Sequence, residues 1–201
     1  MRFKNTIIYE NDTVIKKIFH EELDFYTEYK FYEQFAYFPY IPKLVGAKNY
    51  SLYLEYIDGE SIYNINMEKQ LLLAKTLAHF HNETYDPFEN TAVVHYDTNL
   101  NNYIYRDDKV FMIDFSDISI ESPLVDIYSV LLFFAEMYEL TQFLKLKKEF
   151  QSTYMSVFRF DLPDDKSILE KEILRFETRR TDFDRNISKS ENYWVNKINI
   201  V

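Results

Sequence analysis

The sequence predicts an α+β fold in which a strand-rich segment, residues 1–57, precedes a mostly helical one, residues 58–201. Short β-branched and aromatic runs joined by turn residues fill the first segment, as in antiparallel hairpins. Long stretches with apolar residues at helical spacing dominate the second segment. One further hairpin pattern lies among the polar loops of the second segment. We therefore expect two lobes of different composition, which together form one domain.

Strands and one helix are expected in the first segment. The turn residues Asn11 and Asp12 separate two apolar runs, which predicts an antiparallel hairpin. A helical pattern follows and ends before Pro39, because proline cannot continue a helix. A second strand pair leads into the turn at Gly59. The expected elements are strands at 7–9 and 14–19, a helix at 20–38, and strands at 44–45 and 51–57.

Helices dominate the second segment. The clearest begins at Met67, where apolar residues recur at helical spacing as far as Tyr85. A hairpin pattern then closes at Asp107 and Asp108. From Pro123 the pattern is helical almost to the end of the chain. The expected elements are helices at 67–85, 124–138, 140–158 and 165–187, and hairpin strands at 103–105 and 110–113.

Composition excludes several classes of protein. The chain has no cysteine, which excludes a disulfide scaffold, a thiolate metal site and a cysteine nucleophile. Its net charge of −10 argues against binding nucleic acid or an anionic membrane through bulk charge. The strongest apolar stretch, Val130–Ala135, is far shorter than the ~20 residues that span a bilayer. Because no long apolar segment follows Met1, the sequence predicts a cytoplasmic protein without a membrane span.

The run from His95 to Asn102 carries the pattern most informative about chemistry. It contains H-x-D-x-x-x-x-N, and Asp114 follows the next hairpin. Phosphoryl transfer needs a carboxylate that accepts the proton of the acceptor hydroxyl, and oxygen ligands that hold Mg²⁺ against the phosphates. Since the hairpin returns the chain, we expect Asn102 and Asp114 to lie close together. The pattern predicts Asp97 as the base and Asn102 and Asp114 as metal ligands.

In the order of its motifs the sequence resembles the protein-kinase-like superfamily. The similarity is greatest to its small atypical branch, which includes aminoglycoside and choline phosphotransferases, lipopolysaccharide kinases and the small kinase of the tRNA threonylcarbamoylation complex. The resemblance runs from about residue 5 to residue 140. It implies a two-lobed protein-kinase-like fold with a reduced N-terminal lobe. It also implies an enzyme that uses ATP and Mg²⁺ to phosphorylate a hydroxyl of a small molecule or sugar.

The resemblance implies further site residues. The run Thr13-Val14-Ile15-Lys16 resembles the strand whose lysine binds the α- and β-phosphates, and Glu28 resembles the ion-pair partner of that lysine. His95 and Asp126 resemble residues that support the catalytic loop. The segment similar to the hinge, whose backbone would hold the adenine, contains Glu55, Tyr56 and Ile57.

Two of these assignments have alternatives among their neighbours. Lys16 and Lys17 are adjacent on a strand, so their side chains point to opposite faces. We favour Lys16 because it directly follows the apolar pair Val14-Ile15. Glu28 competes with other acidic residues of the same expected helix, which are Glu21, Glu22 and Glu33.

The chain departs from the family pattern at three places. No glycine precedes Gly46, so the Gly-rich loop that covers the phosphates is absent from the sequence. Ser116 and Tyr96 stand where many relatives carry glycine. The missing loop favours a rival hypothesis, a pseudokinase or nucleotide-binding scaffold that works with a protein partner completing the nucleotide site. The complete set of candidate catalytic residues opposes it.

The acceptor is expected to be a small-molecule hydroxyl, carried by a cationic compound or a sugar. Acidic residues are frequent near the C-terminal helices, where small-molecule relatives bind acceptors, although such residues also form ordinary solvated faces. These acids are Asp161, Asp164, Asp165, Glu170, Glu177, Asp182 and Asp184. An atypical protein kinase is an alternative, but the segment 116–122 is too short for a phosphorylation-gated loop of the usual type.

A metal-dependent hydrolase that uses His79 and His81 is a third hypothesis. Residues two apart on a helix point about 200° away from each other. The two imidazoles therefore cannot easily share one ion, and a core or surface position is expected for both.

Overall fold

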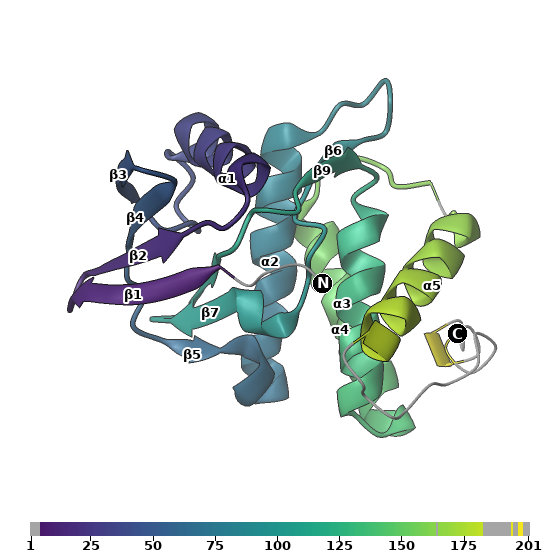
Figure 1. Cartoon of the computed structure of the whole chain (residues 1–201). Helices are drawn as coiled ribbons and strands as arrows, with labels where there is room; N and C mark the ends of the chain where they lie inside the picture. Colours follow the sequence, from purple (N-terminus) through teal and green to yellow (C-terminus); the bar gives the residue numbers. More distant parts are fainter. Residues whose placement is uncertain (1–4, 164, 183–193, 195–196, 199–201) are drawn as a thin grey trace. The chain divides into compact units, whose positions relative to one another are not determined.

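The computed structural model describes residues 5–163, 165–182, 194 and 197–198 (Figure 1). The chain divides into two compact units, each built from two stretches of sequence. Unit 1 comprises Met1–Thr76 and Asn101–Ile118, and unit 2 comprises Leu77–Leu100 and Ser119–Val201. The predicted α+β class is confirmed, since antiparallel sheets make up much of unit 1 and helices much of unit 2. Unit 1 also contains the hairpin of residues 103–112, which the sequence assigns to the helical segment.

A four-stranded antiparallel sheet in the order β1-β2-β4-β3 forms much of unit 1 (Figure 1). Its strands are β1 (Thr6–Asn11), β2 (Val14–Ile18), β3 (Leu44–Lys48) and β4 (Ser51–Glu55). The register pairs Lys16 with Tyr53 and Lys17 with Leu52. Because successive side chains on a strand point to opposite faces, the two lysines lie on opposite faces of this sheet.

Helix α1 (Glu22–Phe35) packs against β3 and β4. Its buried side carries aromatic residues and the carboxylate of Glu28. Glu28, Phe31, Tyr32 and Phe35 are all buried. Their spacing of three and four residues places them on one side of the helix. The competing acids lie on exposed positions of the same segment, and they are Glu21, Glu22 and Glu33.

A second antiparallel sheet of unit 1 has the order β5-β7-β8. Its strands are β5 (Glu60–Ser61), β7 (Tyr103–Arg106) and β8 (Lys109–Met112), with a short 3₁₀ helix, η1 (Ile62–Asn64), after β5. Asp107 and Asp108 turn the hairpin with φ of 52° and 57°, the left-handed conformation that two-residue hairpin turns require. A Cβ atom at Gly59 would lie 2.4 Å from the carbonyl oxygen of Tyr105, so the approach of β5 to β7 requires glycine.

Unit 2 is built on a largely buried helix, α3 (Leu124–Met137), which packs against α4 (Leu140–Val157) and α5 (Lys166–Asp182) (Figure 1). A short ladder pairs β6 (Ala92–Val94) with β9 (Ser119–Glu121). The division between the units falls within α2 (Met67–Thr84) and within the 3₁₀ helix η2 (Leu100–Asn102). Within the described part of the chain, no helix combines the length and the apolarity that a membrane span requires.

Most expected elements are present within a few residues of their predicted bounds. The helices expected at 67–85, 124–138 and 140–158 differ from α2, α3 and α4 by one residue at their C-terminal ends. The last expected helix, 165–187, is seen as α5, and its residues 183–187 lie outside the described residues. The β6–β9 ladder was not predicted, because strands of three residues are too short to show an alternating pattern.

Candidate active site

Lys17, Glu28 and Asp114 form a charged cluster in unit 1. The Nζ atom of Lys17 lies 2.6 Å from Oε2 of Glu28 and 2.7 Å from Oδ1 of Asp114. The three residues come from β2, α1 and the segment after β8. The side chains of Lys17 and Glu28 are buried, whereas that of Asp114 is 41% exposed. The exposed carboxylate of Asp114 is therefore bonded to the buried ion pair of Lys17 and Glu28.

The structure corrects the expectation that Lys16 is the partner of Glu28, because Lys17 makes this ion pair. Lys16 lies on the other face of the sheet, with its Nζ atom 5.6 Å from the centroid of the Tyr53 ring. The apolar pair before Lys16 did not indicate which face is buried. In the structure Phe19 is buried and lies two residues from Lys17, on the same side of the extended chain, so this is the face that is covered.

The cluster has more negative than positive charge, and the pKa values of its members reflect this. Burial of its carboxyl group raises the pKa of Glu28 to about 7, despite the opposing attraction of Lys17. Burial alone would lower the pKa of Lys17, but the attraction of Glu28 and Asp114 raises it above its usual value. One ammonium group is thus paired with two carboxyl groups. The cluster can therefore accept a further cation beside the exposed carboxylate of Asp114.

The β7–β8 hairpin brings the candidate metal ligands Asn102 and Asp114 to the same end of its ladder. Ile113 donates its backbone N–H to the carbonyl oxygen of Asn102 at 2.9 Å, and Asp114 is the next residue along the chain. Asp114 has a φ of 65°, and the hydroxyl of Ser116 donates a hydrogen bond to its Oδ1 atom at 3.1 Å. Amide and carboxylate oxygens are hard ligands of the kind that Mg²⁺ prefers. These residues therefore fit a magnesium ion.

The ring of Phe115 anchors this segment to α1. It stacks on Phe31 with the ring centroids 3.9 Å apart and meets Tyr32 edge to face. A hydrogen bond from the Phe115 backbone also acts on Glu28 and opposes the rise in its pKa. Asp114 and Glu28 are therefore held to each other through the backbone and the aromatic core, as well as through Lys17.

The hinge residues of the sequence analysis lie at the end of β4 in unit 1. The backbone N–H groups of Glu55 and Tyr56 donate to the carbonyl oxygens of Lys43 and Thr13, at 2.9 Å and 2.7 Å. The Glu55 carboxylate lies 3.5 Å from the guanidinium of Arg106. Ile57, the next residue, is buried.

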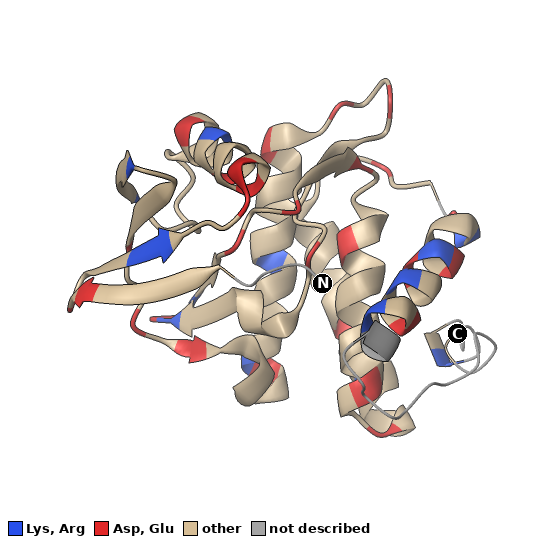
Figure 2. Ribbon diagram, viewed as in Figure 1, with Lys and Arg blue, Asp and Glu red and all other residues tan. Residues whose placement is uncertain are grey.

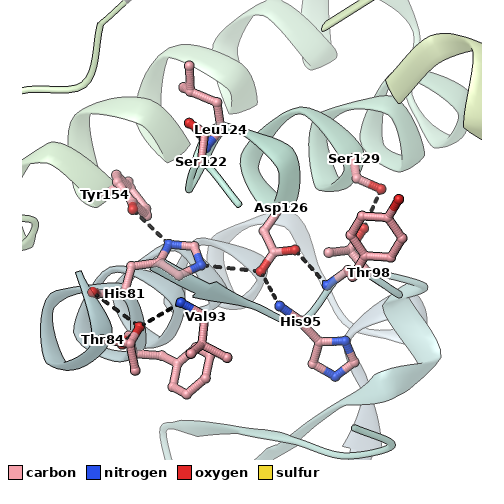
Figure 3. Close-up of polar contacts among 12 residues, drawn as sticks. His81, Thr84, Val93, His95, Thr98, Ser122, Leu124, Asp126, Ser129 and Tyr154 are labelled. Atoms are coloured by element: carbon pink, nitrogen blue, oxygen red, sulfur yellow. Dashed lines mark hydrogen bonds and ion pairs between the residues drawn. The ribbon is translucent and has the colours of Figure 1, made fainter. Parts of the chain in front are cut away.

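In unit 2, Asp126 holds the backbone that leads to Asp97. Its carboxylate is fully buried near the start of α3, and it accepts hydrogen bonds from the backbone N–H groups of His95 and Tyr96 at 2.7 Å and 2.9 Å (Figure 3). The Nε2 atom of His81 lies 3.2 Å from the same carboxylate. Burial alone would raise the pKa of Asp126, but the hydrogen bond and charge of His81, followed by His95, lower it.

The imidazole of His81 links Asp126 to α4. Its Nδ1 atom lies 2.8 Å from the hydroxyl of Tyr154, and the ring is fully buried (Figure 3). His81 thus has a core position, one of the two positions expected from the sequence. On the other side of Asp97, the hydroxyl of Thr98 donates a hydrogen bond to the hydroxyl of Ser129 on α3 (Figure 3). The residues on both sides of Asp97 are therefore bonded to α3.

Tyr96 adopts a backbone conformation that favours glycine, with a φ of 66°. This is the position at which relatives of the resembled family usually carry glycine. The bond from its N–H to Asp126 supports the turn on one side. On the other, the guanidinium carbon of Arg175 lies 3.9 Å from the centroid of the Tyr96 ring. These contacts explain how a bulky residue is tolerated here, because the surroundings fix a conformation that it would otherwise avoid.

Asp97, the candidate base, is paired with an arginine of α5. The Nη1 atom of Arg179 donates to Oδ1 of Asp97 at 2.8 Å, and both side chains are partly exposed. Sequence reasoning missed Arg175 and Arg179. Their spacing along α5 indicates a shared face, but no sequence pattern shows which loop that face contacts.

The acidic residues expected to bind the acceptor are not gathered into one site in the described part of the chain. Two of them accept hydrogen bonds from other residues, and two others are exposed. Asp165 accepts a hydrogen bond from the backbone N–H of Ser167 at the start of α5. Glu177 accepts one from the indole N–H of Trp194. Asp161 and Glu170 are exposed. Asp164, Asp184 and the side chain of Asp182 lie outside the described residues.

Comparison with known proteins identifies the fold. No family model matches the sequence, and no curated protein matches it. Among solved structures, the aminoglycoside phosphotransferase APH(2'')-Ib with bound ADP matches with a TM-score of 0.58 and 15% identity, over 98% of this chain and 91% of that one. Choline kinase LicA from Streptococcus pneumoniae matches with a TM-score of 0.64 and 15% identity, over 96% and 86%. A type I macrolide 2'-phosphotransferase matches with a TM-score of 0.63 and 12% identity, over 98% and 90%.

These structures share the protein-kinase-like fold of small-molecule phosphotransferases. The chain has this same fold, as its sequence motifs predict.

Proposed function

We propose that the protein is a phosphotransferase that moves the γ-phosphoryl group of ATP to a hydroxyl group of a small molecule or sugar, with Mg²⁺. The observation that carries the proposal is the cluster in unit 1, where a buried lysine–glutamate pair holds the exposed carboxylate of Asp114. The fold supports it, because similar structures are described as an ADP-bound aminoglycoside phosphotransferase and a choline kinase.

In this proposal, unit 1 supplies the groups that bind the nucleotide. Lys17 neutralises charge on the phosphates, and Glu28 holds its ammonium group in place. Asn102 and Asp114 would hold Mg²⁺, which supplies further neutralisation of phosphate charge when it is bound. The backbone of the hinge segment, residues 55–57, would hold the adenine.

Asp97 in unit 2 acts on the acceptor. It orients the hydroxyl group and accepts its proton, as the hydroxyl oxygen bonds to the γ-phosphorus and the bond to ADP breaks. Positioning and electrostatic stabilisation supply most of the rate in reactions of this class. The bonds from Asp126 and Ser129 fix the residues beside Asp97, and they therefore serve this positioning.

Isothermal titration of ATP, with and without Mg²⁺, tests the nucleotide site. Wild-type protein should bind ATP more tightly with Mg²⁺, and Asp114→Asn should weaken that dependence. Lys17→Met should weaken binding by about 10- to 100-fold, because a hydrogen bond to a charged group contributes about 1.5–3 kcal/mol. Lys16→Met is the matched control, since this neighbouring lysine lies on the other face of the strand, and it should bind like wild type.

Two outcomes would contradict the proposal. Folded wild-type protein that binds no ATP would favour the scaffold hypothesis, in which a protein partner completes the nucleotide site. Equal losses for Lys16→Met and Lys17→Met would show that the cluster around Lys17 is not the phosphate site.

A further inference from the structure

Helix α5 turns a basic face toward Tyr96 and Asp97 within unit 2. Lys171, Arg175 and Arg179 recur every four residues, a spacing that places them on one side of the helix. Figure 2 shows basic residues repeated along this helix. Arg175 stacks on the ring of Tyr96, and Arg179 forms an ion pair with Asp97. Two successive positions of the α5 face therefore contact two successive residues of the loop.

Arg175 also has a partner on its own helix. Its guanidinium forms an ion pair with the buried carboxylate of Glu172, one turn earlier on α5. The Arg175 side chain is 16% exposed, so little of it reaches solvent. Glu172 is thus the inner anchor of a chain of contacts that runs through Arg175 to the ring of Tyr96. These contacts fix α5 against the left-handed turn that precedes the candidate base.

Arg179 acts on the candidate base directly. A base must place a carboxylate oxygen about 2.6–3.2 Å from the hydroxyl whose proton it accepts. The side chain of Asp97 has two rotatable bonds and is part-exposed, so its hydrogen-bond partners help to set the orientation of its carboxylate. The charged hydrogen bond from Arg179 to Oδ1 restricts the orientation of this carboxylate.

We propose that Arg179 is a positioning residue for phosphoryl transfer. Its ion pair with Oδ1 holds the Asp97 carboxylate in the orientation that accepts the proton of the acceptor hydroxyl. Arg175, anchored by Glu172, supports the backbone turn at Tyr96 from the same helix face. The inference rests on the proposed function, and it adds a contribution of α5 to the chemistry of the loop.

Basal ATP hydrolysis tests this role without knowledge of the acceptor, because water then takes the place of the acceptor hydroxyl. Arg179→Ala should lower kcat by about 10-fold with the KM for ATP changed less than about two-fold, since the nucleotide groups are untouched. Arg179→Lys should restore part of the rate, because lysine keeps the charge but lacks the planar fork. Lys171→Ala, an exposed position on the same face, is the matched control and should retain the wild-type rate.

A double-mutant cycle connects the effect to Asp97. Asp97→Asn should lower kcat by about 10²- to 10⁴-fold, the usual contribution of a general base. In the Asp97→Asn background, Arg179→Ala should cause little further loss, because its target is already changed. A full additional 10-fold loss there would overturn the proposal, as would a wild-type rate in Arg179→Ala.

The same set of variants separates failure of this inference from failure of the proposed function. If Asp97→Asn is inactive and Arg179→Ala is not impaired, only the positioning role fails. If Asp97→Asn also keeps the wild-type rate, or wild-type protein does not hydrolyse ATP, the function on which the inference rests fails with it. Thermal unfolding of wild type, Asp97→Asn, Arg179→Ala and the double variant gives a second test. If the ion pair forms in solution, the stability losses of the two single variants should not add up to that of the double variant. Additive stabilities would overturn the proposal independently of turnover.

Discussion

Two buried carboxyl groups, Glu28 in unit 1 and Asp126 in unit 2, have pKa values shifted in opposite directions. Both side chains are inaccessible to solvent. The pKa of Glu28 rises to about 7, whereas that of Asp126 falls below its usual value. Glu28 shares the single ammonium group of Lys17 with Asp114, while Asp126 accepts hydrogen bonds from two backbone N–H groups and lies beside His81. Burial raises the pKa of both groups, so the opposite directions follow from the partners that each carboxylate has.

The same difference separates the roles that we assign to the two groups. Asp126 is satisfied by the chain itself, so its network is suited to fixing a loop. The cluster around Glu28 has surplus negative charge, so it is suited to respond to a ligand that brings positive charge to Asp114.

Replacing Asp126 should have the largest effect on stability. Asp126→Ala leaves the N–H groups of His95 and Tyr96, and the ring of His81, without their carboxylate acceptor. Breaking a buried charged network from one side costs about 3–5 kcal/mol of unfolding free energy. Urea unfolding measures this loss. Asp126→Asn is the milder control, because its amide oxygen keeps one acceptor. A loss below about 1 kcal/mol for Asp126→Ala would contradict the role of the network.

The pH dependence of the unfolding free energy should report the protonation of the Glu28 carboxyl group. Its pKa is about 7 in the folded protein and near 4.5 in the unfolded chain, so the folded state binds more protons between these values. The resulting stabilisation is complete below about pH 4.5 and is lost as pH rises through about 7. Glu28→Gln removes this loss. Relative to wild type, its unfolding free energy should therefore rise by roughly 2–3 kcal/mol between pH 5 and pH 8.

Unit 2 supplies a matched variant for this measurement. Burial raises the pKa of Glu172 to about 7 as well, despite its ion pair with Arg175. Glu172→Gln should therefore flatten the pH profile in the same sense as Glu28→Gln. Asp126→Asn should not, because a lowered pKa gives a stabilisation that is lost toward acid pH. Identical profiles for Glu28→Gln and Asp126→Asn would contradict the comparison.

The smallest expected effect concerns the turn at Tyr96. Tyr96→Ala should destabilise the protein by about 1 kcal/mol, because it removes the contact with Arg175 and keeps the left-handed strain. Tyr96→Gly loses the same contact but relieves that strain. Urea unfolding should therefore find the glycine variant more stable than the alanine variant by about 1 kcal/mol. A glycine variant that is no more stable would show that the turn is not strained.

Local patterns predicted the parts of the site that depend on short stretches of chain. The hairpin that brings Asn102 to Asp114 follows from two apolar runs and a turn, because hairpin register is set by the turn between its strands. The choice between Lys16 and Lys17 depends on which face of β2 meets α1. Alternation does not decide it, because Val14 and Ile18 share a face with Lys16 as Ile15 and Phe19 do with Lys17. The contact between Arg179 and Asp97 joins residues 82 positions apart, so only the packing of α5 determines it.

The bonds from Asp126 to His95 and Tyr96 also have a consequence for how the chain folds. They join residues 30 and 31 positions apart, and the bond to Tyr96 supports a residue in the left-handed conformation. The segment before Asp97 therefore becomes ordered only when α3 has docked, late relative to local hairpins and helices. In hydrogen exchange, the amide protons of His95 and Tyr96 should accordingly open together with the start of α3, as one cooperative element.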